Sequence, residues 1–155
     1  MAWQSYGLDR EAQKLVLMVK QQDADALNQS YKMRMAVAYG LERFWGEHLR
    51  LQAKEQDRIK SGYWKGTWDA LVKIKEQDRI KSWYWKGTWD ALVKIAAKAH
   101  VEIPNDSVSL KDTKALQAMS EKLWKLDVAD QRVALAVLAQ LCDCLVWWTQ
   151  RYKKT

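Results

Sequence analysis

A tandem repeat of 21 residues constrains the fold of this chain more than any other sequence feature. Residues 54–74 read KEQDRIKSGYWKGTWDALVKI, and residues 75–95 repeat this segment at 20 of 21 positions, with Trp83 in place of Gly62. Repeats of solenoid proteins normally occur three or more times. Two nearly identical copies instead indicate a recent tandem duplication, or an engineered insertion, inside one domain.

The repeat length is compatible with helical structure. Twenty-one residues complete slightly under six turns at about 3.6 residues per turn, so the apolar face of the second copy is rotated by about 60° from that of the first. One long helix through both copies, to about residue 99, is the favoured expectation. The alternative is a hairpin that breaks at Lys-Gly-Thr-Trp-Asp, where Gly66 or Gly87 ends a helix.

The composition excludes several classes of protein. One Pro and six Gly are too few for the turns of a β-sandwich or barrel. Cys142 and Cys144 are two positions apart, which suits neither a disulfide framework nor a metal site and favours a reducing cytoplasm. We expect no membrane span, because no apolar run approaches about 18 residues, and no signal peptide, because the N-terminus lacks a basic segment followed by an apolar stretch.

The hydrophobic pattern predicts an all-α fold, a compact bundle of four to six helices in a single domain over residues 1–155. The expected helices are residues 9–22 with Asp9 as N-cap, 26–52, 54–99, 109–125 opened by a capping box of Ser109 and Asp112, and 127–154 opened by Asp127. Residues 101–108 contain the single Pro and form the clearest loop. In the second helix, seven apolar residues at spacings of three and four are expected to face the core: Leu27, Tyr31, Met35, Ala38, Leu41, Trp45 and Leu49.

The charge is compatible with a nucleic-acid partner. The formal net charge is +7, and each repeat copy contributes +2, so a 134-residue parent, 155 minus 21 residues, carries +5. Basic side chains neutralise phosphates, and aromatic rings stack on unpaired bases. The candidate contacts to an RNA backbone are Lys32, Arg34, Arg43, Arg50, Arg58, Lys60, Lys65, Arg79, Lys81, Lys86, Arg151 and Lys153. An alternative is that these cations form a solvated face, diluted by Glu55, Asp57 and Asp69.

The ten Trp residues support two interpretations. Trp64, Trp68 and Leu71 have helical spacing and are expected in the core or in an interface. The total exceeds what a core of this size needs, and Trp is frequent at the centre of protein interfaces. We therefore expect contacts with other subunits and leave self-association open.

Candidates for catalysis are few. Arg43 and His48 form an Arg-x4-His pattern that resembles HEPN ribonucleases, in which the His and Arg would polarise a 2′-hydroxyl and stabilise the scissile phosphate. The alternative is that both are solvated groups on an amphipathic helix. Cys142 and Cys144 lie in an apolar helix, where free Cys is usually a small buried hydrophobe. No pattern predicts a metal site or a cofactor.

Three segments resemble the small helical subunit of type III-B (Cmr) CRISPR effector complexes. They are residues 9–20, residues 29–49 and residues 129–153. The residues that carry the resemblance in the last two are Tyr31, Gly40, Leu41, Phe44, Ala134, Leu135, Leu145, Trp147, Arg151 and Tyr152. The resemblance implies a cytoplasmic, non-catalytic subunit of an antiviral ribonucleoprotein that contacts the guide–target RNA backbone and neighbouring subunits. Two alternatives remain, a HEPN-like ribonuclease and a protein–protein adaptor or engineered duplication with incidental charge.

Overall fold

Six α-helices and two short 3-10 helices form the part of the chain that the computed structural model describes, residues 7–65 and 68–153, with side chains from 7–54 and 77–153. The helices are α1 (Leu8–Gln22), η1 (Ala24–Asn28), α2 (Gln29–Ala36), η2 (Val37–Tyr39), α3 (Leu41–Lys65), α4 (Trp68–Lys98), α5 (Thr113–Trp124) and α6 (Val128–Tyr152). No strand occurs among these residues. The predicted all-α bundle is therefore confirmed.

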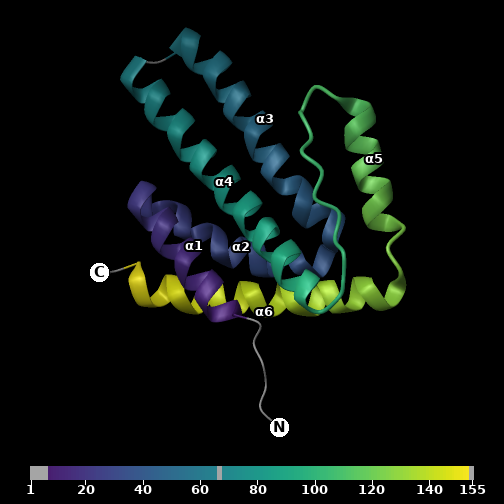
Figure 1. Cartoon of the computed structure of the whole chain (residues 1–155). Helices are drawn as coiled ribbons and strands as arrows, with labels where there is room; N and C mark the ends of the chain where they lie inside the picture. The colour runs from purple at the N-terminus through teal and green to yellow at the C-terminus, as the bar shows by residue number, and fades with distance from the viewer. Residues whose placement is uncertain (1–6, 66–67, 154–155) are drawn as a thin grey trace.

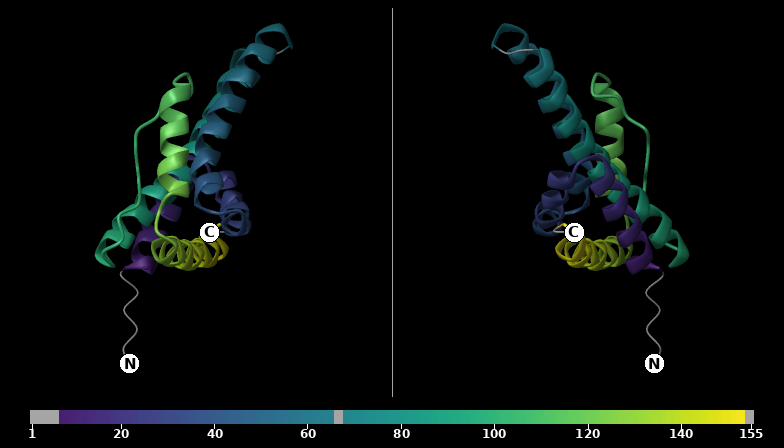
Figure 2. Two further views of the ribbon diagram at one scale, coloured as in Figure 1. Left: turned by 90° about the vertical axis from the view of Figure 1, so that its right-hand side faces the viewer. Right: turned by 90° about the vertical axis from the view of Figure 1, so that its left-hand side faces the viewer.

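The helices form a body with a projecting hairpin. Helix α6 lies across the base of the bundle and packs against α1 and α2 (Figure 1). Helices α3 and α4 are antiparallel neighbours, and the end at which they join projects beyond the other helices (Figures 1 and 2). Helix α5 lies beside α3, and α2 lies on the opposite side of the molecule from α1 (Figure 2). The core therefore forms where the base of the hairpin meets α1, α2 and α6.

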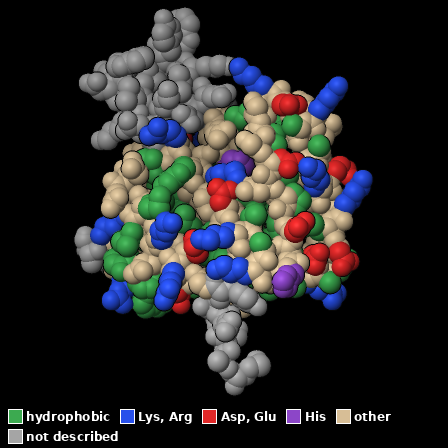
Figure 3. Space-filling view, viewed as in Figure 1, with side chains coloured by type: hydrophobic (Ala, Val, Ile, Leu, Met, Phe, Trp, Pro, Cys, Tyr) green, Lys and Arg blue, Asp and Glu red, His purple; other side chains and the backbone are tan. Residues whose placement is uncertain are grey.

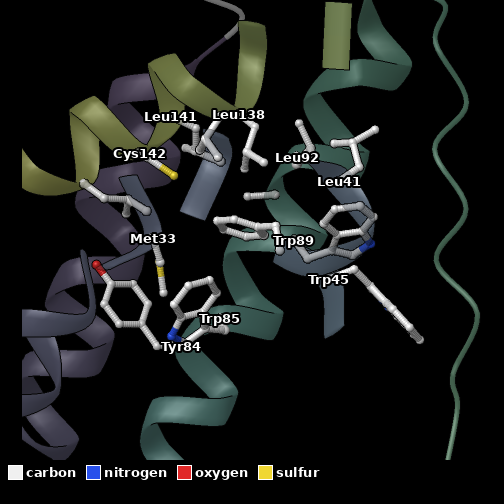
Figure 4. Close-up of a cluster of buried hydrophobic side chains, with 14 of the residues drawn as sticks. Met33, Leu41, Trp45, Tyr84, Trp85, Trp89, Leu92, Leu138, Leu141 and Cys142 are labelled. Carbon is white, nitrogen blue, oxygen red and sulfur yellow. The ribbon is translucent and has the colours of Figure 1, made fainter. Parts of the chain in front are cut away.

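The core is built around the second repeat copy (Figure 4). Tyr84, Trp89 and Leu92 of α4 are fully buried. The ring of Phe44 in α3 lies 4.9 Å from that of Trp85 and 6.4 Å from that of Trp89, measured between centroids. Each large aromatic side chain buries about 150–250 Å², so this cluster supplies much of the hydrophobic stabilisation. The corresponding prediction for Trp64, Trp68 and Leu71 falls on side chains outside the described residues.

The expected helix over residues 26–52 was wrong, because the chain is interrupted at Gly40. Gly40 has φ 94° and ψ 173°, a backbone conformation that is accessible almost only to glycine. It separates η2 from α3, so the apolar spacing on either side belongs to two helices with different orientations. Helix α1 likewise begins at Leu8, with Gly7 rather than Asp9 at its N-cap position.

The favoured long helix through both repeat copies was also wrong. Helix α3 ends at Lys65 and α4 begins at Trp68, so the alternative hairpin forms in the first copy. The second Lys-Gly-Thr-Trp-Asp sequence lies inside α4, whose 31 residues include the whole second copy. An antiparallel pair lets α3 and α4 bury apolar side chains against each other, which a single continuous helix does not.

The remaining local expectations were largely confirmed. Residues 101–108 form an irregular loop. Asp112 caps α5 by accepting a hydrogen bond from the Ala115 backbone N–H at 3.0 Å, so the cap is Asp112 and not Ser109. Asp127 occupies the N-cap position of α6.

Helix α6 corrects the expectation that no segment is apolar and long enough to cross a membrane. Its 25 residues include an 18-residue window with a mean hydropathy of 1.4. The central helix of a helical bundle also meets this criterion, and α6 buries Leu138, Leu141 and Leu145 against the other helices.

Candidate nucleic-acid interface

The outer face of α2 and η2 carries exposed aromatic and apolar side chains. Ser30 and Met33 are buried, so the residues on the opposite side of α2 face outward. Tyr31, Met35 and Tyr39 follow at four-residue spacing, with exposed fractions of 39%, 73% and 68%. Aromatic rings that are exposed to this extent can stack on other planar groups.

Two cations accompany these side chains. Lys32 is exposed on α2 and forms no ion pair with any described residue. Arg43 extends from the first turn of α3, and its guanidinium carbon lies 5.4 Å from the centroid of the Tyr39 ring. We name Tyr31, Lys32, Met35, Tyr39 and Arg43 the α2 strip. Neither cation pairs with a carboxylate of the described residues, so an anion can bind them without displacing one.

Three other predicted cations are paired with acids. Arg34 forms an ion pair with Asp143 of α6 at 2.6 Å. Lys86 bonds to Asp90 at 2.5 Å, and Arg50 pairs with Glu47 on the same helix. A phosphate would have to compete with these carboxylates, so these three residues are weaker candidates than Lys32 and Arg43.

The C-terminal end of α6 carries two further predicted cations, Arg151 and Lys153. Arg151 lies over the rings of Trp147 and Trp148, at 5.6 and 5.7 Å from the ring centroids. Lys153 donates a hydrogen bond to Asn28, immediately before α2. Because Asn28 is a neutral partner, Lys153 keeps its net charge at one end of the α2 strip.

The other predicted cations lie elsewhere. Arg79 and Lys81 are on α4, and neither forms an ion pair with a described residue. Arg79 lines a small pocket with Gln22, Ile80 and Trp83, at the end of α1. The side chains of Arg58, Lys60 and Lys65 lie outside the described residues. The structure therefore distributes the nine candidates whose side chains it describes over several surfaces.

The face shown in Figure 3 is also asymmetric in charge. Acidic side chains gather toward the side of α5 and the loop before it, whereas the side of α1 carries mostly basic and hydrophobic side chains (Figure 3). Arg10 and Lys14 are exposed on α1 and were not among the predicted contacts. Asp9 and Glu11 flank Arg10 in the chain, whereas Lys14 has no acidic neighbour in sequence.

Arg43 and His48 are not brought together as a catalytic pair. Five residues separate their directions by about 140° around a helix. Arg43 is exposed, whereas His48 is 6% exposed and its Nδ1 atom hydrogen-bonds to the Trp45 carbonyl. Burial lowers the pKa of His48, which disfavours the charged imidazole. The predicted ribonuclease geometry therefore has no support from this arrangement.

The cysteines are unfavourable nucleophiles. Cys142 is buried and Cys144 is partly buried. Burial raises the pKa of both thiols, that of Cys144 to about 12. A thiol with such a pKa is almost entirely protonated at neutral pH. In the described residues, no group of three His, Cys, Asp or Glu side chains is placed to hold a metal ion.

Sequence reasoning missed the aromatic part of the interface. Tyr31, Met35 and Ala38 were expected in the core, but all three are exposed. The buried positions in this segment are Ser30, Met33 and Val37, which also have helical spacing. Gly40 was the signal that could have distinguished the expected core positions from the observed ones. A helix break at this glycine means that the residues before it and after it need not share one apolar face.

Comparisons with protein-family models, with curated proteins and with solved structures found no match for this chain.

Proposed function

We propose that this chain is a non-catalytic helical protein that binds single-stranded RNA, mainly through the RNA backbone. The observation that carries the proposal is the α2 strip, where exposed aromatic rings stand beside Lys32 and Arg43, two cations without an acidic partner among the described residues. Phosphate neutralisation releases counterions and supplies affinity, while stacking tolerates any base sequence. The net charge of +7 favours the same class of ligand.

The proposal extends to a multi-subunit assembly. The resemblance of three segments to the Cmr small subunit supports a role in an RNA-guided antiviral ribonucleoprotein, in which other subunits cleave the target. Exposed Trp147 offers an anchor for a neighbouring subunit. If the chain is instead a protein–protein adaptor, it will bind partners without RNA.

Binding of labelled single-stranded RNA at several salt concentrations tests the proposal. We expect binding at about 50 mM salt that weakens steeply toward 200 mM. The double variant Lys32→Ala/Arg43→Ala should reduce the slope of log affinity against log salt by about 1.4, because each lost phosphate contact removes about 0.7 for single strands.

A matched control removes the same amount of charge elsewhere. Arg50→Ala/Lys86→Ala deletes two cations that already have acidic partners, so the salt slope should change little. Equal losses in the two variants would reject the α2 strip as the contact surface. Absence of binding by the unaltered chain at 50 mM salt would reject RNA binding altogether. RNA cleavage that Arg43→Ala abolishes would reject the non-catalytic assignment.

A further inference from the structure

A pocket adjoins the α2 strip where the start of α3 meets the end of α5 and the first turns of α6. Its volume is about 340 Å³, within the range of small-ligand sites. The residues that line it are Tyr39, Gly40, Leu41, Glu42, Arg43, Leu123, Trp124, Gln131 and Leu135. The pocket thus shares Tyr39 and Arg43 with the α2 strip and combines them with residues about 80 to 90 positions later in the chain.

Two aromatic rings line this pocket and remain largely exposed. Tyr39 is 68% exposed and Trp124 is 62% exposed, the highest values for aromatic side chains in the described part of the chain. Leu123 beneath them is 2% exposed and belongs to the core. Two exposed rings at one pocket offer surfaces on which a planar ligand can stack.

The polar groups of the pocket are mainly acceptors. Glu42 accepts a hydrogen bond from the Ser120 hydroxyl at its Oε1 atom, at 3.1 Å, and its Oε2 atom has no partner among the described residues. Gln131 donates from Nε2 to the carbonyl oxygens of Trp124 and Leu126, at 3.3 and 2.7 Å. These bonds fix the amide orientation, so Oε1 of Gln131 is an acceptor as well.

We propose that this pocket binds one unstacked nucleobase that carries an exocyclic amino group. The inference rests on the proposed RNA binding and adds a base preference to it. Tyr39 and Trp124 supply stacking surfaces, and the Arg43 guanidinium, beside Tyr39, holds the phosphate of the same nucleotide. Glu42 accepts a hydrogen bond from the amino group.

Uracil lacks that amino group. At the corresponding position it presents a carbonyl oxygen, an acceptor that would face the carboxylate of Glu42. Two acceptors cannot form a hydrogen bond, and burial of an unpaired polar group costs binding free energy. Cytosine and uracil have similar stacking surfaces and differ in this group, so they form a matched pair of ligands.

The test compares the affinities of single-stranded C10 and U10 oligoribonucleotides for the full chain. We expect C10 to bind about tenfold more tightly, the discrimination typical of one good base contact. Glu42→Gln should reduce this ratio to about twofold or less, because the amide also offers a donor to uracil, and should keep the salt slope. Trp124→Ala should weaken both oligonucleotides by about tenfold through lost stacking.

Trp147→Ala is the control, since it removes an exposed ring on α6 outside the pocket, and it should leave the C10 to U10 ratio unchanged. Circular dichroism of each variant verifies the helical fold. Equal affinities of the unaltered chain for C10 and U10, with normal salt dependence, overturn the pocket and leave the proposed RNA binding intact. If neither oligonucleotide binds at about 50 mM salt, both proposals fail.

Discussion

The two copies of the 21-residue repeat occupy different positions in the α3–α4 hairpin. The second copy, residues 75–95, lies within α4 at the centre of the bundle, and Tyr84 and Trp89 are fully buried. The first copy, residues 54–74, includes the end of α3 and the start of α4, where the hairpin projects from the body (Figure 1). Nearly identical sequences therefore have different roles in one chain.

Tertiary contacts favour the helical form of Lys-Gly-Thr-Trp in the second copy. In the second copy this sequence is helical, although Gly lowers helix stability by about 1 kcal/mol relative to Ala. A Cβ atom on Gly87 would lie 3.0 Å from Leu15 Cδ2, so glycine permits the close approach of α1 and α4. In the first copy, α3 ends at Lys65 and α4 begins at Trp68.

The single difference between the copies lies where the second copy meets α1. Trp83 is 40% exposed and lines a pocket with Gln22, at the last turn of α1, and with Ile80. The corresponding residue of the first copy is Gly62, in α3. The side chain that distinguishes the copies thus lines a pocket between α4 and the end of α1.

Substitution of Trp89 and of the equivalent Trp68 should produce the largest difference in stability between the copies. Trp89→Ala removes a fully buried ring that stacks near Phe44 and donates to the Pro104 carbonyl, so we expect a loss of about 3–5 kcal/mol in the free energy of unfolding. Trp68→Ala, the same change in the first copy, should cost much less. Chemical denaturation monitored by circular dichroism measures both, and equal losses would show that the copies are energetically equivalent.

Tyr84 and the equivalent Tyr63 of the first copy should show a smaller difference in stability, which depends on one hydrogen-bond network. The Tyr84 hydroxyl lies 2.5 Å from Ser30 Oγ, which in turn lies 2.8 Å from Thr149 Oγ1, so it links α4 to α2 and α6. Burial raises the pKa of Tyr84 to about 12, so the hydroxyl stays neutral. Tyr84→Phe should cost about 1–2 kcal/mol by removing this buried partner. Tyr63→Phe is the matched control, and a loss as large as that of Tyr84→Phe would contradict the assignment of the network to the second copy.

The pH dependence of stability tests the contact between α3 and the second copy. The Ser82 hydroxyl donates to the His48 backbone carbonyl at 2.7 Å, and burial lowers the pKa of the His48 side chain below its ordinary value of 6.5. In the unfolded chain His48 therefore binds a proton at higher pH than in the folded protein. Its contribution to stability is complete above pH 6.5 and is lost as the pH falls through the lower folded pKa.

Unfolding measured between pH 4 and pH 8 detects this dependence. His48→Gln should flatten the part of the profile near and below pH 6.5. An identical profile in His48→Gln and the unaltered chain would show that the buried imidazole does not titrate with unfolding.

Much of the fold was predictable because it depends on local patterns. Helical periodicity, the N-cap of Asp112 and the loop around Pro104 are encoded within a few residues. The hairpin was not decided by local pattern, since Lys-Gly-Thr-Trp-Asp is compatible with a helix and with a break. Its outcome depends on contacts of α4 with α1, α2 and α6, which are distant in the chain.

The candidate site was predictable only in part. Positive charge and aromatic content are visible in the sequence, and they led to Lys32 and Arg43. The ion pair between Arg34 and Asp143 joins residues 109 positions apart, so neutralisation of Arg34 could not be inferred from its neighbours. The pocket formed by Tyr39 and Trp124 likewise requires the packing of α5 and α6 against the start of α3.

Deletion of the first repeat copy, residues 54–74, should leave the core intact. His48 and Ser82 are 34 positions apart, and deletion of 21 residues leaves 13, which suffice for a turn because connections between helices in bundles commonly take two to eight residues. Phe44 and Trp85, which pack together, lie outside residues 54–74. The chain without residues 54–74 should therefore fold with a shorter hairpin and an intact core.

The two possible deletions form a matched pair. Removal of residues 54–74 leaves Trp, and removal of residues 75–95 leaves Gly, at the position that contacts the end of α1; the products are otherwise identical. The Gly product should be less stable by about 1–3 kcal/mol, since it loses helix propensity and the partly buried indole. Thermal and chemical unfolding compare them directly. If neither product folds, the projecting part of the hairpin is needed for the bundle; if both are equally stable, Trp83 does not stabilise the second copy against α1.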